Sequence, residues 1–136
     1  MINNFTPNVR CVLSVLYAEE RCAEMLIKRL SVLGFENLKI NKAISYNEFS
    51  INLSSNIKQD VWDIDEAISY SFSSVKDKLN ELKAIVDETN GRFFVGIIIE
   101  KFDVYPTMLF SGENMKVIHF LNADISMDCL DFGTQT

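Results

Sequence analysis

The chain has 136 residues, of which 48% are hydrophobic and 24% are charged, and its formal net charge is −6. This size and balance fit one globular domain, and an acidic surface disfavours nucleic-acid binding, which depends on cationic side chains that meet phosphates. The apolar runs are far shorter than the roughly 20 residues of a transmembrane helix, so we expect no membrane contact. The run Cys11–Ala18 lacks the basic leader of a signal peptide, so we expect a cytoplasmic protein. We expect a single domain, residues 1–136, in which residues 1–8 are a loose leader.

The N-terminal third predicts a strand followed by a helix. Arg10–Tyr17 is rich in Val and Leu and is typical of a strand. Glu19–Leu33 is predicted to be a helix because its apolar residues recur at helical spacing. Gly34 suits the position after the helix end, and we expect Phe35 to pack back on Leu30 in a Schellman arrangement.

Two further strands are predicted next, at Leu38–Ile44 and Glu48–Ser54. The second should have one wet face, because apolar and polar residues alternate along it. Its apolar set is Phe49, Ile51 and Leu53, and its polar set is Ser50, Asn52 and Ser54. The stretch 56–70 fits no single element.

A strong helical pattern covers Ser74–Thr89, with Ser74 and Asp77 as a variant capping box and Asn90-Gly91 as its end. Arg92–Phe102 then predicts a strand whose centre is continuously apolar. Such a run is typical of burial on both faces of a sheet.

The last elements are a helix at Gly112–Asn122, capped by Ser111, and a strand at Ala123–Phe132. On that strand Asp124, Ser126 and Asp128 should share one face, and Ile125, Met127 and Cys129 the other. The element order predicts an α+β fold with a mostly antiparallel sheet and helices packed on one face. More narrowly, it predicts a ferredoxin-like βαββαβ core plus an extra αβ unit.

One known family resembles this arrangement. Val104-Tyr105-Pro106-Thr107-Met108-Leu109-Phe110-Ser111 precedes a helix, and Leu121-Asn122-Ala123-Asp124-Ile125-Ser126-Met127-Asp128 follows it. This is similar to the C-terminal signature of the bacterial domain of unknown function 4279, a "P-x-L-x-(L/F)-S" strand, a helix and an "A-x-(I/L)-D-I-D" strand. The resemblance covers about residues 9–132 and implies a fold, but no reaction, because the function of that family is unknown.

Residues that carry catalysis are scarce. Cys11, Cys22 and Cys129 are far apart and are interpreted as small hydrophobic residues. His119 is the sole histidine, so any Ser-His-Asp or Cys-His site would have to use it. The chain has no phosphate-binding or dinucleotide-binding motif and no zinc-type cluster. We therefore expect a protein that is not an enzyme, with no cofactor and no metal.

Two acidic groups remain as candidate partner-binding residues. One surrounds the only tryptophan and the other lies on the last strand. Aromatic anchors supply much of the energy of protein interfaces, and rim carboxylates speed the encounter with basic partners. The alternatives are a tryptophan that only anchors an irregular segment, a solvated sheet face, or a metal site, although no EF-hand spacing is present. The candidates are Tyr46, Asp60, Trp62, Asp63, Asp65, Glu66, Tyr70, Asp124 and Asp128.

The leading hypothesis is a binding protein with a basic protein partner. More narrowly, we expect an immunity protein that neutralises a cationic bacterial toxin domain, such as a nuclease, by direct contact. The alternative is a small regulatory or ligand-binding domain that acts as a homo-oligomer and pairs through the half-polar strand Glu48–Ser54. An enzyme that combines the carboxylates with a metal is a third hypothesis.

Overall fold

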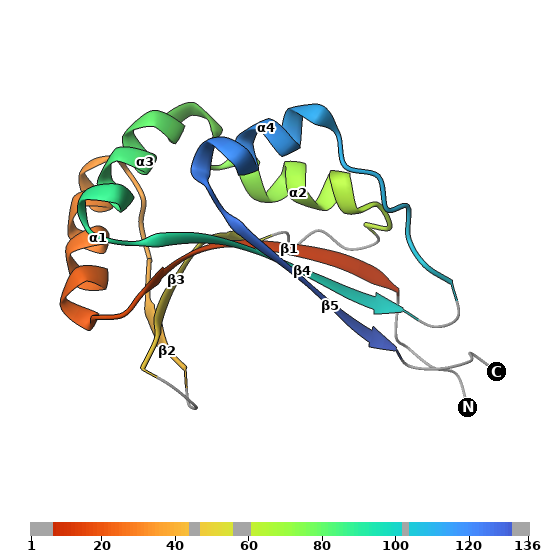
Figure 1. Ribbon diagram of the computed structural model, residues 1–136, viewed down its shortest axis with the longest axis horizontal. Coiled ribbons are helices and arrows are strands. Elements are labelled where there is room, and N and C mark those ends of the chain that lie inside the picture. The colour runs from red at the N-terminus through yellow and green to blue at the C-terminus, as the bar shows by residue number, and fades with distance from the viewer. Residues whose placement is uncertain (1–6, 44–46, 56–60, 102–103, 132–136) are drawn as a thin grey trace.

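A computed structural model describes residues 7–43, 47–55, 61–101 and 104–131. The chain has an α+β fold with one five-stranded sheet in the order β2-β3-β1-β4-β5. Helices lie across one face of this sheet, and the other face is open (Figure 1). The mostly antiparallel sheet agrees with the prediction, since only β5 runs parallel to its neighbour. Among the described residues, no helix has both the length and the apolar character needed to cross a membrane.

The elements follow each other as predicted in outline. Their bounds are β1 Asn8–Tyr17, α1 Glu20–Val32, β2 Ile40–Lys42, β3 Phe49–Ser55, α2 Ile64–Ser73, a 3₁₀ turn Lys76–Lys78, α3 Leu79–Glu88, β4 Arg92–Lys101, α4 Gly112–Leu121 and β5 Asp124–Asp131. The predicted ends Ile44, Phe102 and Phe132 lie outside the described residues.

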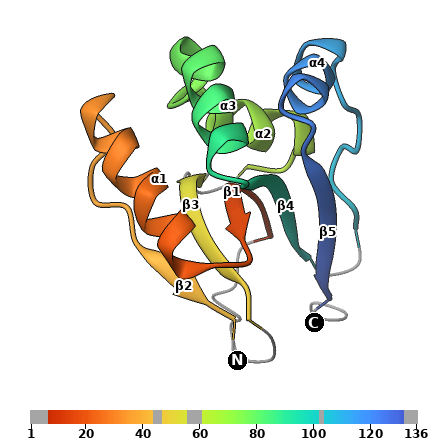
Figure 2. The same ribbon diagram turned by 60° about the vertical axis from the view of Figure 1, so that its left-hand side comes forward.

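Strand β1 is the centre of the sheet. It pairs with β3 on one side and with β4 on the other, both antiparallel. Val9, Cys11, Leu13 and Val15 alternate along it and are completely buried. Since alternate side chains of a strand point to the same face, this row forms the sheet side of the core under the helices. The arrangement of the helices over this side is seen in Figure 2.

Helix α1 ends in the predicted Schellman arrangement. The amide of Phe35 donates to the carbonyl of Leu30 at 3.1 Å, and the amide of Gly34 donates to Ser31 at 3.2 Å. Gly34 has a φ of +96°, a left-handed conformation that glycine adopts without steric cost. The sequence therefore predicted this turn correctly, including the residue that makes it possible.

The wet face of β3 is interrupted by a bulge. Leu13 pairs with Ser54 but Ser14 pairs with Asn52, so one residue of β3 has no opposite partner. As a result Ser54 turns toward the helices, where its hydroxyl lies 3.1 Å from the hydroxyl of Ser71. The prediction that Ser54 shares a face with Ser50 and Asn52 is wrong for this reason.

The region predicted as one helix at Ser74–Thr89 is a 3₁₀ turn, Lys76–Lys78, followed by the shorter helix α3, Leu79–Glu88. Helix α2 occupies the segment that fitted no element, and Ser74 ends it instead of starting the next helix. Asp63 begins α2 by accepting hydrogen bonds from the amides of Asp65 and Glu66. The capping box predicted for Ser74 and Asp77 is wrong, because Ser74 is the last, C-terminal cap residue of α2 and α3 begins only at Leu79, with no side-chain cap.

Strand β4 is buried on one face only. Its residues alternate between buried and half-buried from Phe93 to Lys101, after the exposed Arg92. Phe93, Val95 and Ile97 lie in the core, whereas Phe94 and Ile98 lie on the open face. Burial on both faces was predicted from the apolar run, and it is wrong because no described element covers the open face.

The C-terminal part forms a β4-α4-β5 unit. Ser111 caps α4 as predicted, with its hydroxyl accepting from the amide of Asn114 at 3.1 Å. Asn122 ends the helix in a left-handed conformation with φ +52°. The chain then returns along β4 in parallel, because α4 carries it back across the sheet. Strand β5 thus becomes an edge of the sheet (Figure 2).

We predict that Gly91→Ala lowers the free energy of unfolding by about 1–3 kcal/mol, the usual range for overpacking. An added Cβ at Gly91 would lie 2.7 Å from both Tyr17 and Val15, too close for a real contact. Urea unfolding followed by circular dichroism measures the change.

Gly112→Ala is the matched control, since nothing lies within 4 Å of its added Cβ. It should leave the stability unchanged or raise it by up to about 1 kcal/mol, because alanine favours a helix. Equal unfolding midpoints for the two variants would contradict the close packing of Gly91 against β1.

Candidate functional site

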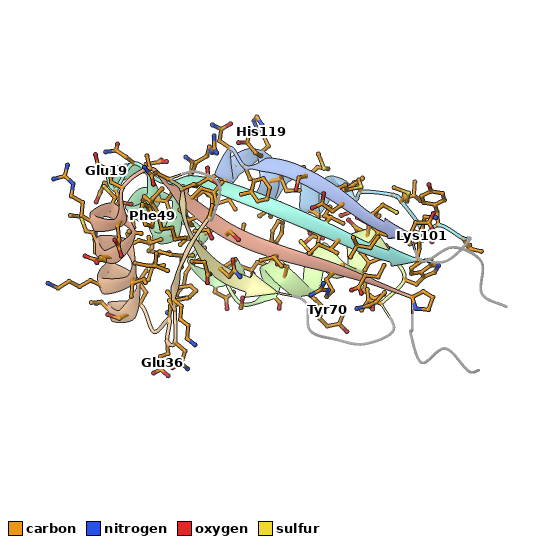
Figure 3. The ribbon with its side chains drawn as sticks, turned by 90° about the horizontal axis from the view of Figure 1, so that it is seen from below. Glu19, Glu36, Phe49, Tyr70, Lys101 and His119 are labelled. Carbon is orange, nitrogen blue, oxygen red and sulfur yellow. The ribbon has the colours of Figure 1, made fainter. Side chains whose placement is uncertain are left out.

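The predicted partner-binding residues lie in two separate places. Trp62, Asp63, Asp65, Glu66 and Tyr70 belong to the start and body of α2, on the helix side of the sheet. Asp124 and Asp128 belong to the edge strand β5. In Figure 3, which looks at the sheet from below, Tyr70 of α2 and His119 of α4 lie toward opposite edges of the sheet, and both helices are on the same face (Figure 1). Tyr46 and Asp60 lie outside the described residues.

Asp65 connects α2 to the beginning of α4. Its carboxylate accepts from the amide of Ser111 at 2.8 Å and from the side-chain amide of Asn114 at 2.9 Å. Partial burial by itself would raise the pKa of Asp65, but these hydrogen bonds outweigh it and hold the pKa below the ordinary value of 3.8. The charged carboxylate is thus part of the packing of two helices.

Trp62 is half-buried and packs against the core. Its carbonyl accepts from the amide of Thr107 at 3.3 Å, and the amide of Ile64 donates to the carbonyl of Thr107 at 3.1 Å. These contacts anchor the segment before α2 to the connection between β4 and α4. Glu66 and Tyr70 are exposed nearby. A binding role for the residues around Trp62 stays a prediction.

Strand β5 divides its side chains between the two faces as predicted. Asp124 lies opposite Phe94 and Asp128 opposite Ile98, so both aspartates are on the open face. Ile125 lies opposite Val95 and Met127 opposite Ile97, so these two are on the helix face. The two-residue period of a strand thus places carboxylates and apolar groups on different sides of one edge.

Three large apolar side chains of β5 are exposed, although two of them, Ile125 and Met127, face the helix layer. Ile125 is 40% exposed, Met127 43% and Leu130 47%. Twelve large hydrophobic residues in the described part of the chain are exposed, and nine of them lie between residues 104 and 130. The nine are Val104, Tyr105, Met108, Leu109, Met115, Phe120, Ile125, Met127 and Leu130. We call these nine residues the apolar edge surface.

The three aspartates of β5 differ in their ion pairs. Asp128 forms no ion pair with any residue that the structure describes, and Asp124 lies 3.5 Å from the exposed side chain of Arg92. Only Asp131 is tightly held: the Lys101 ammonium lies 3.0 Å from its carboxylate and 4.3 Å from the centre of the Tyr105 ring. This interaction closes the far end of the β4–β5 pair, and Figure 3 shows Lys101 there.

The groups with catalytic potential are separated in space. Cys11 is buried at the centre of β1, which raises the pKa of its thiol to about 11 and suppresses the reactive thiolate. His119 and Cys129 are exposed, on α4 and β5 respectively. Within the described part of the chain, no three His, Cys, Asp or Glu side chains gather as metal ligands.

Sequence reasoning missed the apolar edge surface, although one signal pointed to it. Met108, Met115 and Met127 are three of the five methionines of the chain, and all three are exposed. Methionine is flexible and polarisable and is common on surfaces that adapt to partners. Their clustering near the C-terminus could have drawn attention to this region.

Comparisons with known proteins do not extend this description. No family model, curated protein or solved structure matches the chain. The resemblance to the domain of unknown function 4279 stays a prediction.

We predict that Asp65→Ala lowers the free energy of unfolding by about 1–3 kcal/mol at neutral pH, because two donors lose their acceptor and the Asn114 amide is buried. The folded-state pKa is lowered, so the ionised carboxylate stabilises the fold above its unfolded pKa and this contribution is lost as the pH falls through the folded pKa. The difference from the native chain should therefore shrink below about pH 4. Chemical denaturation at several pH values measures it.

Asp77→Ala is the control, since Asp77 is exposed in the turn before α3. It should change the stability little at any pH. A loss for Asp65→Ala that is independent of pH would show that the charge of Asp65 does not contribute.

Proposed function

We propose that this chain is a binding protein whose partner is a basic protein, and that the partner docks on β5 and the apolar edge surface. More narrowly, we propose an immunity protein that neutralises a cationic toxin domain by direct contact. The observation that carries the proposal is the concentration of exposed apolar side chains on the C-terminal αβ unit, beside the carboxylates of Asp124 and Asp128.

Physical reasoning favours an interface at this place. Many exposed large apolar side chains in one region of a fold are typical of a site of contact. Burying residues such as Leu109 and Met127 supplies binding energy, while the carboxylates at the border select the sign of the partner's charge. The formal net charge of −6 strengthens long-range attraction to a cationic protein.

The narrower proposal adds what such a complex would do. A nuclease domain has a cationic active site, because it must bind phosphates. A small acidic domain that covers that site excludes the substrate by occupying the same surface. The contact needs no reaction by the chain itself.

The sheet order is consistent with a core to which a separate αβ unit has been added. We propose that the segment from β1 to β4 is a ferredoxin-like core, and the order β2-β3-β1-β4 with antiparallel neighbours supports this. Helix α4 and strand β5 are then the added αβ unit. The proposed binding surface lies on the added unit and on the connection that leads into it.

The test uses the product of the gene that lies beside the one for this chain, purified and titrated by calorimetry. We expect a complex with an affinity that falls as salt is added, because the encounter is electrostatically steered. The double variant Asp124→Lys/Asp128→Lys should weaken it by about tenfold or more, in the range of desolvated charge pairs. Asp77→Lys/Asp87→Lys, with the same change in net charge on and beside α3, should weaken it less.

Two results would count against the proposal. Absence of binding to a neighbouring cationic protein would remove the immunity role. An equal loss of affinity in both double variants would show that net charge matters and that β5 does not.

A second candidate function has its own observation. Val12, Leu16, Phe94 and Ile98 are half-buried apolar side chains on the open face of the sheet, next to Ser50 and Asn52. Two copies of the chain that stack through this face would bury them. This is the arrangement expected if the chain is a regulatory or ligand-binding domain that acts as a homo-oligomer.

Sedimentation velocity over a wide concentration range tests this second function. The homo-oligomeric function requires a dimer that survives dilution. Phe94→Lys should dissociate this dimer, whereas Ser50→Lys, at the β3 side of the same face, should leave more of the dimer intact. A monomer at all concentrations would remove it.

A further inference from the structure

We infer that the partner adds an extended segment to the outer edge of β5 as a sixth strand, and that cationic and apolar residues alternate along this segment. The inference rests on the proposed function and specifies the chemistry of the partner.

The outer edge of β5 is long and open. Within the described residues, no strand pairs with its outer side, so a row of backbone N–H and C=O groups along eight residues is available. Proteins usually protect such edges with short strands, proline, lysine or bulges. At the opposite end of the sheet, β2 is only three residues long and ends in Lys42. Residues 124–131 contain no Gly, Pro or Lys and pair with β4 in unbroken register.

The side chains that flank this edge define what an added strand would carry. On the open face, the added strand would lie beside Asp124 and Asp128, so cationic residues fit there. On the helix face, it would lie beside the exposed Ile125 and Met127, so apolar residues fit there. Side chains alternate between the two faces of a strand, so cationic positions beside Asp124 and Asp128, four residues apart, alternate in the added strand with apolar positions beside Ile125 and Met127.

Helix α4 forms the wall of this edge on the helix side. Asn114 bonds to Asp65 and Ser69 of α2, so that side of the helix faces inward. Met115 and His119 directly follow the buried Asn114 and Ile118, so by helical geometry they share a face about 100° around the helix from its inward side. Figure 3 shows His119 beyond the outer edge of β5. Apolar side chains of an added strand would therefore meet Ile125 and Met127 on the face of the sheet that α4 covers (Figure 2).

A second copy of the chain is a poorer occupant than a cationic segment. If two β5 strands paired around a twofold axis, the aspartates of both copies would share the open face at cross-strand or diagonal distance. Like charges at these distances destabilise a sheet. The same carboxylates stabilise a strand that places lysine or arginine opposite them, so the charges on the edge select a basic partner strand.

The test uses a fluorescein-labelled nine-residue peptide in which Lys and Val alternate, with both ends blocked, and follows its binding by anisotropy. Two further peptides carry N-methyl groups, one on the Lys amides and one on the Val amides. A strand directs one alternate set of its amides toward the neighbouring strand and the other set away. One methylated peptide should therefore bind about tenfold or more weakly, since several hydrogen bonds are lost, and the other should bind nearly as well as the parent.

Changes in the protein complete the test. Asp128→Lys should lower the affinity for the parent peptide about fivefold, within the range of cross-strand charge pairs. The matched variant Asp77→Lys should lower this affinity less. Hydrogen exchange followed by NMR should show slower exchange at alternate amides of β5 when the peptide is bound.

Three results would overturn the inference. These are equal affinities for the two methylated peptides, unchanged exchange along β5, or a dimer of the chain whose β5 amides are already protected. Suppose that one of these results appears, but the charge reversals at Asp124 and Asp128 still weaken binding to the cationic protein encoded by the neighbouring gene. Strand addition is then wrong and the proposed function stands. If that protein does not bind at all, the proposed function fails as well.

Discussion

The double pairing of β1 is the constraint on which the rest of the structure depends. Because β1 bonds to β3 and β4 at once, its alternate side chains Val9, Cys11, Leu13 and Val15 form one completely buried row. An apolar row of this kind has to be covered, and the apolar stripes of α1, α2 and α3 cover it. The opposite face of β1 carries the polar Arg10 and Ser14 among its side chains, and the sheet therefore keeps one open face.

The sequence predicted the elements whose signals are local. Gly34 marked the end of α1, and Ser111 marked the start of α4, because each satisfies backbone groups within a few residues. Helix α2 was not predicted, since serines at positions 69, 71, 73 and 74 favour helices only weakly. Its position is decided by the core, which buries Ile64, Ile68 and Phe72. The bulge in β3 likewise results from pairing with a distant strand.

In the candidate site, too, local patterns were predicted from the sequence and features that depend on distant pairing were not. The period of the last strand was enough to predict which face Asp124 and Asp128 share. Nothing in that pattern predicts that Ile125 and Met127, which face the helix layer, stay exposed. Their exposure follows from the edge position of β5, which depends on the strand order of the whole sheet. The aspartates near Trp62 were equally ambiguous, because a carboxylate such as Asp63 that caps a helix looks like a surface charge in the sequence.

The crossover that places β5 also has a consequence for how the chain reaches its native state. Residues 93–99 contain seven consecutive uncharged residues rich in Ile, Phe and Val, a composition that promotes aggregation when it forms an exposed edge. During folding, β4 remains such an edge until α4 has formed and β5 has docked. The docking replaces an apolar border with one that carries three aspartates, which act as gatekeepers against self-association. The C-terminal unit therefore protects the folding chain from aggregation, and damage to α4 should appear first as insoluble protein.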